Sequence, residues 1–155
     1  MSDTDVLVEI VDRAYNRRSW HGTNLRGSIR GLTSRQACWR PARGRHNIWE
    51  IVVHAAYWKY VVQRRLTGAP RGSFPLDGSN WFVRGVASDA MWKEDIAVLD
   101  KTHRALRSAI EAFPPKDWKR PSAGSSVTSL ELVAGIAAHD LYHAGQIQLI
   151  KRLLR

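Results

Sequence analysis

Three histidines stand at positions that favour a metal site. His139 and His143 lie four residues apart in the run Ala-His-Asp-Leu-Tyr-His-Ala. On a helix this spacing puts both imidazoles on one face, one turn apart, where both can bind the same ion. His54 interrupts another apolar helical pattern, between Ile51 and Trp58. Three inward histidines from two helices predict a centre with three protein ligands and an open position for water or substrate.

An alternative interpretation needs no metal. A buried imidazole requires a polar partner, and a backbone carbonyl or a hydroxyl can supply one. The three histidines would then be ordinary core or subunit-interface residues. The residue pattern alone leaves both interpretations open.

If a metal is bound, the ligand set favours zinc or nickel, one ion per chain. Neutral imidazoles also suit copper, cobalt and ferrous iron, but no acidic ligand is evident beside the three histidines. Such an ion would acidify a bound water, or its open position would accept the thiolate of a thiol cosubstrate.

Three further polar residues lie on the same helix faces. Glu50, one turn before His54, is expected to cap its helix rather than act as a base. Gln146, one turn after His143, is expected to pack, with orientation of a ligand or water as the alternative. His103 is expected to be a core or interface residue rather than a fourth ligand. Three aromatic residues are candidates for a pocket wall, with ordinary packing as the alternative: Tyr57, Trp58 and Tyr142.

Four helices are predicted to position these residues, over about 4–30, 47–66, 88–113 and 128–155. Asn47 and Thr128 are each followed by Glu three residues later, which is the capping-box signal of a helix start. Pro114 and Pro115 end the third helix because proline cannot continue the hydrogen-bond ladder. No strand alternation is evident between the helices. The predicted fold is therefore all-α, one domain over residues 1–155.

The link between the second and third helices, about residues 67–87, predicts a crossover. An antiparallel hairpin of helices needs far fewer residues. At roughly 3.3 Å per extended residue, this link can return along a whole helix of about 30 Å. We therefore expect a four-helix bundle with a long connection between helices two and three. Whether the segment 70–86 covers the site or a neighbouring subunit is left open.

Composition narrows the class of protein without naming a substrate. The net charge of +10 would attract anions, but the basic residues are scattered, as on a solvated surface. No apolar run is long enough for a membrane span, and the first residues lack the pattern of a secretion signal, so a cytoplasmic location is expected. Cys38 is the only cysteine and has no disulfide partner within the chain.

The residues around the three histidines resemble the DinB/YfiT-like family of metalloenzymes. The resemblance rests on Asn-Ile-Trp-Glu-Ile-Val-Val-His-Ala-Ala-Tyr-Trp at 47–58 and Gly-Ile-Ala-Ala-His-Asp-Leu-Tyr-His-Ala-Gly-Gln-Ile at 135–147, and extends over essentially the whole chain. It implies an up-down-down-up four-helix bundle, commonly a homodimer, with a metal held by His54, His139 and His143. Characterised members resemble S-transferases and isomerases that use low-molecular-weight thiols such as bacillithiol or mycothiol.

The leading prediction is a metal-dependent enzyme, a thiol-dependent S-transferase or a metal-activated hydrolase, acting on a small molecule. One alternative is a basic nucleic-acid-associated protein, but no helix-turn-helix, zinc finger or basic–aromatic alternation supports it. The other is a structural or interaction protein stabilised by the metal, although structural zinc sites usually have four protein ligands. The sequence identifies neither the catalytic residues nor the substrate.

Overall fold

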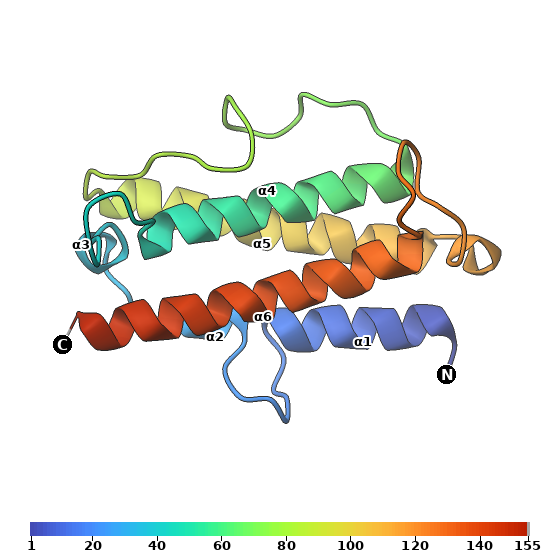
Figure 1. Cartoon of the computed structure of the whole chain (residues 1–155), viewed down its shortest axis with the longest axis horizontal. Helices are drawn as coiled ribbons and strands as arrows, with labels where there is room; N and C mark the ends of the chain where they lie inside the picture. Colours follow the sequence, from blue (N-terminus) through green and yellow to red (C-terminus); the bar gives the residue numbers. More distant parts are fainter. Residues whose placement is uncertain (155) are drawn as a thin grey trace.

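The computed structural model describes residues 1–154 and is all-helical within them, as predicted (Figure 1). Four long helices form the body: α1 (Asp3–Tyr15), α4 (Ile48–Thr67), α5 (Asp89–Ala112) and α6 (Ser129–Leu153). The connections contain two one-turn helices, α2 (Leu25–Ser28) and α3 (Ser34–Ala37), and the 3-10 turn η1 (Pro115–Asp117). Within 1–154, no helix has the length and apolar character needed to cross a membrane.

The predicted starts of the last three long helices are confirmed. Asn47, Ser88 and Thr128 are the N-cap residues, and each side chain accepts a backbone N–H of the first turn. These bonds satisfy donors that have no partner within the helix. Gly68 ends α4 in the left-handed conformation, with φ of 72°. Local signals therefore set the bounds of the helices that carry the candidate ligands.

The prediction of one helix over residues 4–30 is wrong. The helix α1 ends at Tyr15, where the carbonyl of Asp12 accepts the backbone N–H of both Asn16 and Arg17. A loop follows, and Asn24 then caps the one-turn helix α2. The apolar period stops after Ala14, so no buried stripe would stabilise a longer helix.

The four long helices form a four-sided bundle. Helix α4 packs against α5 and α6, and α1 also packs against α5 and α6. In Figure 1, α4 and α5 run in one direction, and α1 and α6 run in the opposite direction. The link between α4 and α5 returns along α4 to the end where that helix began. Four of its side chains pack on the core beside α4: Phe74, Leu76, Trp81 and Phe82.

The apolar core consists of two clusters, with buried polar residues between them. One cluster includes Trp49, Leu99 and Ile147, and the other includes Leu106 and Val133. On each of α4, α5 and α6, buried polar residues occupy the positions between the two clusters: Lys59, His103, Asp140 and His143. The two candidate ligands of α6, His139 and His143, thus lie between the two apolar clusters.

Candidate metal centre

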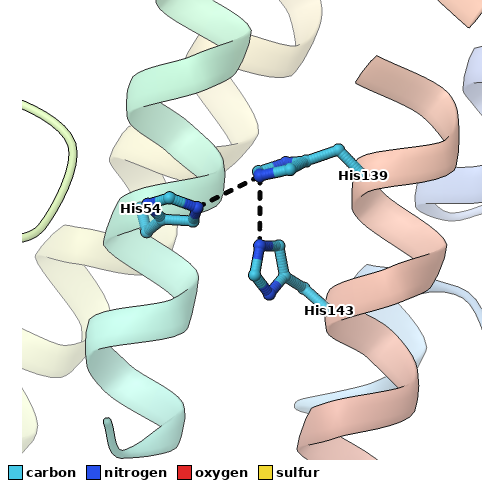
Figure 2. A group of neighbouring side chains, drawn as sticks. All are labelled: His54, His139 and His143. Atoms are coloured by element: carbon cyan, nitrogen blue, oxygen red, sulfur yellow. Dashed lines mark hydrogen bonds between the residues drawn. The ribbon is translucent and has the colours of Figure 1, made fainter. Parts of the chain in front are cut away.

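Two neighbouring helices bring the three histidines together (Figure 2). His54 comes from α4, and His139 and His143 come from successive turns of α6. One ring nitrogen from each histidine lies within 4.8 Å of the other two. His54 and His143 are buried, whereas His139 is half-buried. The predicted residues therefore form one cluster.

The Nε2 atoms face one another. Nε2 of His139 lies 3.1 Å from Nε2 of His54 and 3.0 Å from Nε2 of His143. In a tetrahedral zinc site with bonds of about 2.0–2.1 Å, the nitrogen ligands lie roughly 3.3 Å apart. The two Nε2–Nε2 distances from His139 are thus close to the distance between nitrogen ligands that share one ion.

The other ring nitrogens of His54 and His143 are held by acceptors. Nδ1 of His54 donates to the carbonyl of Asn80 at 2.8 Å, and Nδ1 of His143 donates to Oε1 of Gln146 at 2.7 Å. A proton on Nδ1 leaves Nε2 as a lone pair directed at the centre, which is the tautomer that binds a metal. Nδ1 of His139 is buried and has no partner among the described residues.

Burial keeps all three imidazoles neutral. Burial, together with the weaker effect of neighbouring histidines, lowers the pKa of His54 to about 4 and that of His139 to about 3. Burial also lowers the pKa of His143. Neutral imidazole is the form that a metal requires, so protons compete weakly for these nitrogens near neutral pH.

The donor set fits a divalent cation better than a set of hydrogen bonds. With His54 and His143 protonated on Nδ1, His139 is the only possible Nε2–H donor, and one well-directed bond satisfies only one neighbour. The Nε2 lone pair of the other neighbour would then lie about 3 Å from His139 without a donor. A cation that accepts all three lone pairs removes this conflict.

The link between α4 and α5 supplies a second layer around His54. Asn80 is the only described non-glycine residue with positive φ, at 64°, and its side chain accepts from Nε1 of Trp58 at 2.9 Å. Trp81 stacks between two imidazoles, 3.8 Å from the ring centre of His54 and 3.6 Å from that of His46. The link therefore covers this site rather than standing apart from it.

Two cavities flank the histidines. The larger, about 560 Å³, is lined by His143, Trp81 and Tyr142, among others. The smaller, about 180 Å³, lies on the side of His139 and Trp58. Two of the three aromatic residues predicted as wall candidates, Trp58 and Tyr142, thus line cavities beside the cluster.

Glu50 and His103 take no part in the cluster, as expected. Glu50 is a cap residue that also accepts from Arg40, His46 and the backbone N–H of Arg84. Burial raises its pKa, but these hydrogen bonds outweigh that effect and lower the pKa to about 2.

His103 lies in a separate polar cluster beside Tyr15, Lys59 and Asp12. Gln146, in contrast, orients His143, which was the alternative interpretation of that residue.

Sequence reasoning missed Asn80 and Trp81. Both lie in a long link without helical or strand period, and no spacing relates them to His54. A weak signal was available for Asn80, because asparagine is enriched at left-handed positions such as the one that follows Gly78 and Ser79 here.

Comparison with models of protein families gives a match over most of the chain. The family model described as the DinB superfamily matches residues 17–147, which include all three histidines and the link between α4 and α5. Neither the curated proteins nor the solved structures contain a match.

Proposed function

Since this chain belongs to the DinB superfamily, we propose that it is a metal-dependent enzyme in which His54, His139 and His143 hold one divalent ion. The observation that carries the proposal is the convergence of three neutral imidazole nitrogens, two of which have their tautomer set by an acceptor behind the ring. We propose zinc or nickel, because the ligand set is all-imidazole.

The chemistry would be activation of a thiol or a water. A divalent ion at three histidines lowers the pKa of a thiol or water at its remaining position. The protein's part is to hold the ligand nitrogens in place through Asn80 and Gln146, and to limit access of water through Trp58 and Trp81. We favour transfer of a thiol to a small electrophile and keep hydrolysis as the alternative.

The surroundings of the cluster support a catalytic site rather than a structural one. The cluster has three histidines and no acidic or cysteine ligand among residues 1–154, whereas structural zinc usually has four protein ligands. The cavities beside His139 and His143 leave room for a reactant. We further propose an up-down-down-up bundle, which the helix directions in Figure 1 support, and a homodimer, to be tested by light scattering.

Metal content tests the proposal. Protein purified without an affinity tag is expected to contain about one zinc or nickel per chain by elemental analysis, with at least tenfold less in His54→Ala and His143→Ala, since each loses one of three ligands. His21→Ala is the matched control, because His21 is exposed and lies outside the cluster. Equal metal content in all four proteins, or none in any after incubation with zinc or nickel, would refute the site.

Thiol and water chemistry can then be separated with the loaded protein. Consumption of a free thiol together with a model electrophile, in a one-to-one ratio and lost in His54→Ala, would support S-transfer. Turnover of an ester without thiol would support hydrolysis instead.

A further inference from the structure

The larger cavity beside His143 has apolar walls built from several parts of the chain. Ile51 comes from α4, Trp81 from the link, and Tyr142, Leu149 and Ile150 from α6. Its volume of about 560 Å³ lies in the range of small-molecule sites, and Trp81 also stacks on His54. A small molecule bound in this cavity would therefore contact Trp81, the same side chain that covers the candidate metal ligand His54.

The polar groups of this cavity are mainly hydrogen-bond donors. No Asp or Glu lines it. Oε1 of Gln146 already accepts from His143, so the amide NH₂ group of Gln146 remains to donate. These donors suit a small molecule that carries oxygen atoms able to accept hydrogen bonds.

Arg45 gives the cavity a positive charge that no acidic side chain of the described residues compensates. Two nearby arginines are neutralised: Arg40 pairs with Glu50, and Arg84 pairs with Asp95. The guanidinium of Arg45 has no acidic partner among residues 1–154. A guanidinium with free donors binds a carboxylate through charge-assisted hydrogen bonds.

We propose that this cavity binds an apolar, preferably aromatic, carboxylic acid, with its ring between Trp81, Tyr142 and Leu149 and its carboxylate on Arg45. As the assignment of a substrate class, this rests on the proposed function, because it makes the cavity the subsite of the small-molecule reactant. The smaller cavity, about 180 Å³ beside His139, lies on the other side of the cluster and is left for the second reactant.

Calorimetry with a matched pair of probes tests the cavity. The probes are trans-cinnamate and its neutral amide, cinnamamide, titrated into protein stripped of metal with a chelator. We expect cinnamate to bind, and Arg45→Gln to weaken it about tenfold while cinnamamide is unaffected, since only the charged pair is lost. Leu149→Ala should weaken the binding of both probes about threefold, because the ring of each probe packs on the Leu149 side chain.

Arg43→Gln is the control, since Arg43 is an exposed arginine of the same loop that does not line the cavity. Circular dichroism verifies that each variant is folded. Cinnamate binding that is absent, that survives Arg45→Gln unchanged, or that falls equally in Arg43→Gln would overturn the proposal. Because the protein is metal-free, the result is independent of whether the three histidines hold an ion, which metal analysis decides separately.

Discussion

His139 differs from the other two candidate ligands in how its ring is held. His54 and His143 each donate from Nδ1 to an oxygen, whereas Nδ1 of His139 has no partner among the described residues. Ligand histidines usually have such a partner, which fixes both the tautomer and the ring orientation. The orientation of His139 must therefore depend on packing and on any ion that the proposed site binds.

Substitution of Asn80 tests the second layer. Asn80→Ala keeps the carbonyl that accepts from His54 but loses the bond from Trp58 and places alanine at φ of 64°. That conformation costs alanine roughly 1–2 kcal/mol. We expect the Kd for zinc to rise about tenfold, measured by competition with a coloured chelator.

Asn80→Gly is the matched comparison, because glycine accepts the left-handed conformation without strain. It should stay within about threefold of wild type, since only the bond from Trp58 is lost. Equal Kd values for the two variants would show that the conformation at position 80 does not support the site.

The depressed histidine pKa values predict acid sensitivity of the metal-free protein. His54 titrates at about 4 and His139 at about 3 in the folded chain, against an ordinary value of 6.5. As the pH falls below 6.5, the unfolded chain binds protons that the folded chain does not. The free energy of unfolding should therefore be highest above pH 6.5 and fall toward pH 4.

Urea titrations between pH 7.5 and 5 measure this dependence. His139→Gln should reduce proton uptake on unfolding by about one proton per chain at the lower pH. Stability that is independent of pH across this range would contradict the assignment of neutral buried imidazoles.

The link between α4 and α5 supplies groups to the site in addition to those of the helices. It supplies the carbonyl of Asn80 and the ring of Trp81. The backbone N–H of Arg84, near the end of the link, donates to Glu50 at 3.1 Å. Arg40, before α4, binds the same carboxylate. Glu50 thus ties two connections to the start of the helix that carries His54.

The end of α4 is set by backbone conformation alone. A Cβ at Gly68 would meet no atom within 4 Å, but φ is 72°. Gly68→Ala should therefore destabilise the protein by about 1–2 kcal/mol, the cost of the left-handed conformation. Gly145→Ala, inside α6 and equally free of contacts, should stabilise it by about 0.5–1 kcal/mol. Thermal unfolding measures both, and shifts of the same sign would contradict this explanation.

At the scale of the whole molecule, the bundle contains an ion pair with no access to solvent. The ammonium of Lys59 on α4 bonds to the carboxylate of Asp140 on α6, and both side chains are 0% exposed. His103 on α5 and Tyr15 on α1 lie beside Lys59. The polar cluster around Lys59 therefore contains residues from all four long helices. This cluster lies next to the candidate metal centre, because Asp140 follows His139 directly in α6.

Removal of one partner of this ion pair should be costly. Lys59→Met would leave Asp140 buried without its counter-charge, so we expect a loss of about 3–5 kcal/mol in the free energy of unfolding by urea. The double variant Lys59→Met/Asp140→Leu should recover most of that loss, because an apolar pair needs no solvation. A double variant no more stable than the single one would show that the pair matters through more than its charge.

The sequence by itself determined the all-α class, the starts of three long helices and the faces that carry His54, His139 and His143. Caps and helical period are properties of neighbouring residues, so they need no knowledge of packing. The tertiary structure decided what lies across space: that His54 meets α6, that Asn80 and Trp81 cover it, and that His103 pairs with Lys59 instead. The path of the link between α4 and α5 depends on contacts between distant segments, and a segment without helical or strand period has no local pattern that encodes those contacts.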